Sequence, residues 1–158
     1  AAKESLGGVR VGGNEPTIGR AHLVALLGSF ADDPLKVFLE TNGVLLADPG
    51  YVNDLADLEN LHVRVSLKGC TSKQFSMVTG AREEGFDLQL RALKNLDEAG
   101  VSYHPAILED LADREHLPSL LRSLEWIDGA LVSRLEFERL RPNPHVVRRL
   151  RRIGMTVR

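Results

Sequence analysis

The stretch that decides the fold is Leu61-His62-Val63-Arg64-Val65-Ser66-Leu67-Lys68-Gly69, in which apolar and polar residues alternate. Such alternation predicts a β-strand with one packed face and one polar face. The residues from Lys36 to Gly43 show a similar pattern and end in the same way, at a polar residue followed by glycine. Further strands are predicted at 9–12, 101–108 and 129–137.

Helical patterns separate these strands. Apolar residues recur at helical spacing over 19–30, 48–58, 71–79, 84–99, 116–126 and 144–153. Residues 1–6 resemble the last turn of a helix, so the chain is expected to begin within a repeating unit whose first strand is missing. Strands that alternate with helices roughly every 30 residues predict an α/β fold with a parallel sheet and outer helices, here as one domain over 1–158.

The polar strand faces favour a partial barrel over an open doubly wound sheet. Strands of an open doubly wound sheet are covered by helices on both faces and tend to be apolar throughout. Here the polar positions would line a concave interior, which favours a partial (βα) barrel with a ligand-holding lumen. The residues expected in the lumen are Lys36, Phe38, Glu40, Asn42, His62, Arg64, Ser66, Lys68, Ser102, His104, Arg134 and Glu136.

Composition excludes several classes of protein. The chain has 158 residues, 43% of them hydrophobic and 27% charged, which is typical of a soluble globular domain. A formal net charge of −2 makes nucleic acid an unlikely partner. The sequence shows neither a membrane span nor a signal peptide, so a cytoplasmic location is expected. The single cysteine, Cys70, can form no internal disulfide and no thiolate metal site by itself, and a small semi-buried thiol is the favoured interpretation.

A glycine loop follows the first predicted strand. Val9 and Val11 belong to that strand, and the loop is Gly12-Gly13-Asn14-Glu15-Pro16-Thr17. Two glycines permit positive φ angles and close approach of the backbone to a ligand, and the proline prepares the chain for a helix. The loop is thus a candidate ligand site at the carboxyl end of a strand, where both α/β architectures bind ligands.

Three motifs in chain order resemble radical S-adenosylmethionine (SAM) enzymes, in particular the archaeal-type branch related to pyruvate-formate-lyase activating enzymes. The glycine loop is similar to the family's GGEP loop, Glu40-Thr41-Asn42-Gly43 to its (D/E)TNG segment, and Arg64 to Gly69 to the strand that follows. The resemblance implies that SAM binds at these strand ends. It assigns the methionine amino group to Gly12, Gly13, Asn14 and Glu15, and the ribose and carboxylate to Asn42, Ser66 and Lys68.

The same resemblance implies a [4Fe–4S] cluster held by three cysteines of a CxxxCxxC loop, which this sequence lacks. We therefore expect a fragment of a radical SAM enzyme that is not catalytically competent by itself. In a full-length protein with the cluster, a ferredoxin- or flavodoxin-type reductant would allow SAM to yield a 5′-deoxyadenosyl radical that abstracts hydrogen from an unknown substrate. Candidate substrate-binding residues are Glu40, Arg64, His104 and Glu136; no catalytic residue and no metal ligand is assigned.

Two other functions remain open from the sequence. The chain could be a ligand- or partner-binding module that carries no cluster and performs no turnover. It could also be an ordinary (βα) barrel isomerase or aldolase that uses Lys68 as a Schiff-base amine or His104 as a base. Because an exposed strand edge invites pairing with another chain, a dimer through the edge of the first strand is a further expectation.

Overall fold

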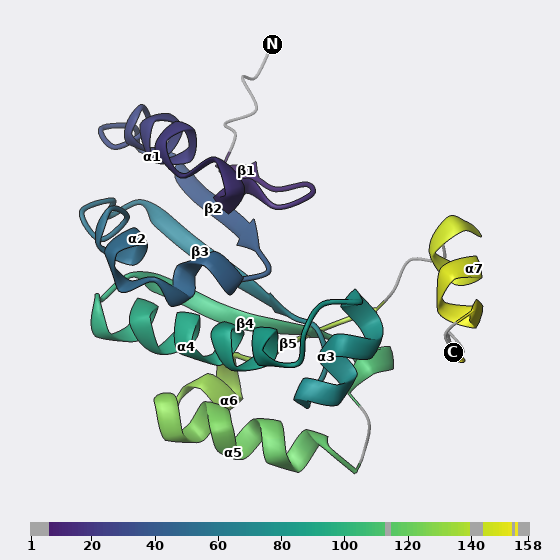
Figure 1. The fold of residues 1–158 in the computed structure, drawn as a ribbon. Coiled ribbons are helices and arrows are strands. Elements are labelled where there is room, and N and C mark those ends of the chain that lie inside the picture. Colours follow the sequence, from purple (N-terminus) through teal and green to yellow (C-terminus); the bar gives the residue numbers. More distant parts are fainter. Residues whose placement is uncertain (1–6, 113–114, 140–143, 153, 155–158) are drawn as a thin grey trace.

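The computed structural model describes residues 7–112, 115–139, 144–152 and 154. Its centre is one sheet of five parallel strands in the order β1-β2-β3-β4-β5 (Figure 1). The strands are β1 (Gly8–Val11), β2 (Lys36–Thr41), β3 (Leu61–Leu67), β4 (Ser102–Leu108) and β5 (Glu136–Glu138).

The helices that connect the strands lie along one side of the sheet, whereas the helix after the last strand lies apart from it (Figure 1). The α-helices are α1 (Arg20–Gly28), α2 (Pro49–Asn53), α3 (Ser72–Thr79), α4 (Glu84–Glu98), α5 (Leu117–Ile127), α6 (Leu131–Arg134) and α7 (Pro144–Arg152). Short 3-10 helices are η1 (Pro16–Gly19), η2 (Val44–Ala47) and η3 (Glu109–Leu111). No helix of the described residues is both long and apolar enough to cross a membrane.

The strand order supports the predicted barrel arc. Each strand pairs with the next one in the sequence, whereas a doubly wound sheet reverses its order at a switch point. The apolar positions of β3, most of those of β4, and Val37 and Leu39 of β2 are buried against the helices as predicted from the alternation, whereas Val9 and Val11 of β1 are half-buried and Phe137 of β5 is exposed. This core comprises Val37, Leu39, Val63, Val65, Leu67 and Ile107 of the strands, and Leu27, Leu93, Leu96, Leu120 and Leu124 of the helices. The α/β class and the partial (βα) barrel are confirmed.

Two predicted elements are wrong in part. The predicted strand over 129–137 contains helix α6, and only 136–138 is extended. Asp128 caps the turn that leads into this helix, because its Oδ1 accepts a hydrogen bond from the Ala130 amide, and Leu131 is buried. The predicted helix over 48–58 is helical only at α2, and the chain before it forms η2 after Gly43, whose φ of 79° starts the turn.

The two ends of the chain are described only in part. The expected helical turn at 1–6 lies outside the described residues, as does residue 153 at the end of the predicted basic helix. The helix itself, α7, is present, and Arg148, Arg149, Arg151 and Arg152 on it are exposed. At the opposite end of the fold, β1 pairs only with β2 among the described strands, so the dimer through this edge remains a prediction.

Asn60 joins the chain before β2 to the chain before β3. Its Nδ2 donates to the carbonyl oxygens of Phe30 at 2.7 Å, Leu35 at 3.0 Å and Asp33 at 3.3 Å. The Phe30 carbonyl also accepts from the Asp33 amide at 3.0 Å, so the side chain of Asn60 matters most as a donor to the carbonyls of Asp33 and Leu35 in the turn between α1 and β2.

We expect Asn60→Ala to lower the free energy of unfolding by about 1–3 kcal/mol, because carbonyl groups that are partly buried lose their donor. Urea denaturation followed by circular dichroism measures this difference. Asn53→Ala, at an exposed position on α2, serves as the control and should change stability by less than about 0.5 kcal/mol. Equal effects of the two substitutions would contradict the role given to Asn60.

Candidate functional site

The carboxyl ends of β1, β2 and β3 bring the three sequence motifs to one edge of the sheet. Gly12, Gly13 and Asn14 are exposed there, and Gly13 and Asn14 have φ angles of 94° and 50°. Within the described part of the chain, the backbone groups of these three residues make no hydrogen bonds. Open space surrounds the position of a Cβ on Gly13, so a ligand can approach its backbone.

Glu15 fastens this loop to the end of β2. Its Oε1 accepts hydrogen bonds from the hydroxyl of Thr17 and the hydroxyl of Thr41, both at 2.6 Å, and from the Thr17 amide at 3.2 Å. Its Oε2 accepts from the Asn42 amide at 2.7 Å. The sequence assigned Glu15 to the ligand, and that assignment stays a prediction. The structure adds that the carboxylate positions the loop, because four protein donors already surround it.

Gln89 of α4 joins the ends of β2 and β3 from the buried side. Its Nε2 donates to the carbonyl oxygens of Asn42 and Ser66, at 2.5 and 3.0 Å, and its Oε1 accepts from the Lys68 amide at 3.2 Å. The side chain is fully buried. The sequence analysis missed this residue, although one polar residue on the apolar face of α4, between Phe86 and Leu93, was an available signal.

Asn42 and Lys68 present different groups at this edge. The Asn42 side chain is used locally, since its Oδ1 accepts a hydrogen bond from the Val44 amide at 2.8 Å. The Lys68 ammonium forms no ion pair with any described residue. Burial lowers the pKa of Lys68, and the charge of Arg64 lowers it further, while Glu138 and Glu15 oppose these effects. A cation with no anionic partner is therefore available to a ligand beside the glycine loop.

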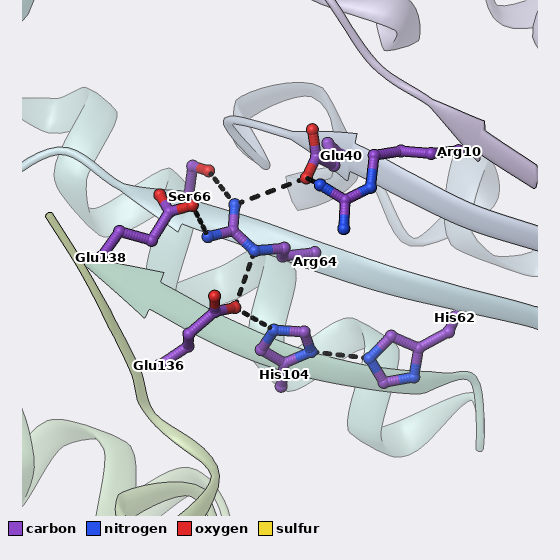
Figure 2. Close-up of polar contacts among 8 residues, drawn as sticks. All are labelled: Arg10, Glu40, His62, Arg64, Ser66, His104, Glu136 and Glu138. Carbon is purple, nitrogen blue, oxygen red and sulfur yellow. Dashed lines mark hydrogen bonds and ion pairs between the residues drawn. The ribbon is translucent and has the colours of Figure 1, made fainter. Parts of the chain in front are cut away.

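Arg64 organises the concave face below this edge (Figure 2). Its Nε donates to Glu136 Oε2 at 2.8 Å, and its Nη1 donates to Ser66 Oγ at 3.2 Å. Its Nη2 pairs with the Glu138 carboxylate, and its Nη1 lies 3.8 Å from Glu40 Oε1. Burial opposes the positive charge, but the hydrogen bonds with Glu136 and Glu138 outweigh it and raise the pKa of Arg64 above its ordinary value.

Further polar contacts extend this network in both directions. Glu40 Oε1 also lies 3.0 Å from Nη1 of Arg10, which is a closer partner than Arg64. On the other side, Glu136 Oε2 lies 2.9 Å from His104 Nε2, and His104 Nδ1 lies 2.6 Å from His62 Nε2. The hydrogen bond from Arg64 is the main reason that the pKa of Glu136 falls to about 2.

The four predicted substrate-binding residues thus belong to one connected network, although no ligand tests their role. Glu138 is a member that the sequence analysis missed, because it lies beyond the predicted end of the last strand. Arg134 was expected in the lumen beside Glu136, and this is wrong. It pairs instead with Asp128 and lies over the ring of Tyr103, 5.4 Å from the centroid, because α6 turns it away from the network.

The described residues do not fit an iron–sulfur cluster. No group of three or more His, Cys, Asp or Glu side chains among them is arranged to hold a metal ion. Cys70 is buried, and its Sγ lies 3.7 Å from the carbonyl oxygen of Leu111. A cluster with three protein thiolates would therefore need cysteines from outside the 158 residues.

We expect Glu15→Gln to destabilise the fold by about 2–3 kcal/mol, because an amide can accept hydrogen bonds through only one of its two heavy atoms. The amide protons of Thr17 and Asn42 should also exchange faster with water in this variant. Hydrogen exchange followed by NMR measures the local effect. Glu59→Gln, at an exposed position, should leave both amides unchanged.

Glu136 predicts a pH dependence of stability. Its pKa is about 2 in the folded chain, against 4.5 for an ordinary glutamate, so the ionised group stabilises the fold above pH 4.5. This contribution is lost as the pH falls from about 4.5 towards 2. The free energy of unfolding, measured in urea between pH 6 and 2, should therefore fall less steeply in Glu136→Gln than in the wild type. Equal slopes would contradict the ionic contact with Arg64.

Two curated proteins are similar in sequence. The first is a "Probable GTP 3′,8-cyclase" of Saccharolobus islandicus, 26% identical over 134 residues, which are 85% of this chain and 42% of that protein. The second is the mycofactocin maturase MftC of Mycolicibacterium smegmatis, 34% identical over 92 residues, or 58% of this chain and 22% of that one. The chain thus spans less than half the length of either relative. No protein-family model matches it.

Two solved structures share the fold. SuiB of Streptococcus suis, in a crystal structure with bound S-adenosylmethionine, gives a TM-score of 0.72 at 20% identity over 93% of this chain and 35% of its own. A domain of the pyruvate-formate lyase-activating enzyme of Bacteroides vulgatus gives 0.64, also at 20% identity, over 95% of this chain and 96% of that domain. The two solved structures show the fold of a partial barrel, and together with the sheet order and the two sequence relatives they support a radical SAM core.

Proposed function

We propose that this chain forms the SAM-binding part of a radical SAM enzyme, with SAM at the carboxyl ends of β1, β2 and β3 and the substrate on the concave face. The observation that carries the proposal is the backbone of Gly12, Gly13 and Asn14, which makes no hydrogen bond with the described residues, at the same sheet edge as the Lys68 ammonium. The similarity in sequence to radical SAM enzymes and in fold to SAM-bound SuiB supports it.

The two ends of the methionine group of SAM match the two parts of this edge. An ammonium group binds carbonyl oxygens, which Gly12, Gly13 and Asn14 present without partners. A carboxylate binds a compact cation, and Lys68 is the cation at this edge without an ion pair among the described residues. Glu15 and Gln89 hold the loops in place, so little ordering is left for the ligand to impose.

Radical chemistry belongs to the whole protein in this proposal. With thiolates from outside these residues, a [4Fe–4S] cluster would supply the electron for cleavage of SAM, and hydrogen abstraction from the substrate would follow. A ferredoxin- or flavodoxin-type reductant and a cytoplasmic location belong to the same proposal. The residues of this chain contribute the SAM edge and the polar concave face.

The alternative is a module that binds the same kind of ligand without turnover. The single, buried Cys70 favours it, because these residues alone hold no cluster. Lys68 also keeps the isomerase or aldolase alternative open, since a buried amine of lowered pKa suits Schiff-base chemistry. Borohydride trapping of a carbonyl compound on Lys68 would favour that alternative over SAM binding.

We expect SAM to bind to the purified chain without iron, as measured by isothermal titration calorimetry. Lys68→Met should weaken this binding at least about tenfold, because it removes a charge-assisted hydrogen bond to the carboxylate while preserving much of the side-chain volume. Lys94→Met is the matched control, since Lys94 lies on the outer surface of α4 and pairs with Glu98 at 3.6 Å. It should leave the affinity unchanged.

The identity of the ligand is tested by competition. S-adenosylhomocysteine, which has the same amino and carboxylate groups, should compete with SAM, whereas adenosine should compete far more weakly. Adenosine that competes as well as S-adenosylhomocysteine would contradict the role given to the glycine loop and Lys68.

A further inference from the structure

A second chain of hydrogen bonds crosses the concave face near the amino ends of the strands. Ser102 Oγ lies 2.8 Å from His62 Nδ1, His62 Nε2 lies 2.6 Å from His104 Nδ1, and His104 Nε2 lies 2.9 Å from Glu136 Oε2. The residues come from β3, β4 and β5, and the parallel register places His62 opposite Ser102 and His104 opposite Arg64. Figure 2 shows the rings of His62 and His104 side by side, with Glu136 beyond them.

The chemistry of the carboxylate assigns a direction to this chain. Ionised Glu136 can only accept, so His104 carries its proton on Nε2. In the neutral ring, His104 Nδ1 is then an acceptor, and the proton of the short contact belongs to His62 Nε2. The remaining His62 nitrogen, Nδ1, accepts from the hydroxyl of Ser102. In the neutral state, each of the three hydrogen bonds therefore has its donor on the side of exposed Ser102 and its acceptor on the side of Glu136.

The surroundings favour positive charge at one ring over the other. His62 is partly buried, beside the ring of Phe38, and the charges of Lys36 and Arg134 add to that of His104 in disfavouring its protonation. His104 faces the Glu136 carboxylate directly, with Arg64 bonded to the same oxygen. A proton that reaches His62 is thus best accommodated on His104, next to Glu136.

We propose that Ser102, His62, His104 and Glu136 form a proton-accepting relay, through which a ligand on the concave face that hydrogen-bonds at Ser102 loses one proton to the histidine pair. This inference rests on the proposed function only in taking the concave face as the substrate side. The ligand group has an exchangeable proton, as a hydroxyl or ammonium group has.

The step balances without an oxidant or reductant. The ligand's O–H or N–H bond breaks and its proton bonds to Ser102 Oγ, while the Ser102 O–H bond breaks and the hydroxyl proton bonds to His62 Nδ1. The proton on His62 Nε2 moves to His104 Nδ1. The products are the deprotonated ligand, neutral His62, and the His104 imidazolium paired with the Glu136 carboxylate. One proton has been transferred over two rings, which is general-base chemistry.

The relay is tested on the chain by NMR of 15N-labelled histidine, with the proton itself as the probe. At pH 8 both rings should be the neutral Nε2–H form. On acidification the pair should take up one proton in a first step, in which the signals of both rings change together. The second proton should bind only at lower pH, because two charged rings whose facing nitrogens, His62 Nε2 and His104 Nδ1, lie 2.6 Å apart repel each other.

Three variants test which side chains stabilise the positive charge on the histidine pair. Glu136→Gln should lower the pH of the first step by about one unit or more, because the imidazolium loses its carboxylate partner. Ser102→Ala should change the His62 Nδ1 signal at pH 8 while the shared step remains. His22→Gln, at an exposed position on α1, is the matched control and should change neither. Backbone amide spectra show whether each variant keeps the fold.

The outcomes separate this relay from the SAM proposal. Independent titration of the two rings, a His62 ring protonated on Nδ1 at pH 8, or no effect of Glu136→Gln in a folded variant would overturn the relay. SAM affinity is measured on Ser102→Ala and should be unchanged, because Ser102 begins β4 whereas the SAM edge lies at the carboxyl ends of the strands. If the wild type does not bind SAM but its two histidine rings still take up the first proton together, the proposed function is overturned and the relay is not.

Discussion

The concave face depends on one buried cation. Arg64 is only 7% exposed in the middle of the central strand, and three carboxylates from β2 and β5 surround its guanidinium. A buried charge that loses a partner destabilises a fold by about 3–5 kcal/mol. Glu136 and Glu138 therefore hold the short last strand in place as well as balancing the charge. The same pairing keeps this face polar, where a closed barrel would fill it with branched aliphatic side chains.

The sequence predicted much of the fold because each strand has two faces of different chemistry. Alternation from Leu61 to Gly69 correctly placed Leu61, Val63, Val65 and Leu67 in the core but did not indicate that Arg64 is buried as well, and glycine and polar residues correctly placed the strand ends. The stretch over 129–137 could not be assigned in the same way. Leu131 and Leu135 suit either a strand or a short helix, and the choice depends on the local Asp128 cap and on packing of α6 against β4, of which the second is tertiary.

The sequence predicted the position of the candidate site but not the hydrogen bonds that fix its loops. Motif order placed the glycine loop, Asn42 and Lys68 at one sheet edge, because the carboxyl ends of parallel strands share an edge. The bonds from Glu15 to Thr41 and from Gln89 to Asn42 join residues 26 and 47 positions apart. No local pattern indicates such pairs. The contact of His62 with His104 depends in the same way on the register between β3 and β4.

The carboxyl edge of the sheet and its concave face are held by different kinds of hydrogen bond, and this difference bears on what each can bind. At the carboxyl edge, the side chains of Glu15 and Gln89 bond mostly to backbone groups, which leaves the backbone of Gly12 to Asn14 as the exposed surface. Backbone groups are the same whatever the side chains, so this edge suits a ligand common to many relatives. On the concave face, side chains bond to side chains, and a single substitution changes the pattern of donors and acceptors. In the proposed function, where the concave face binds the substrate, a single substitution there would therefore change what the chain can accept.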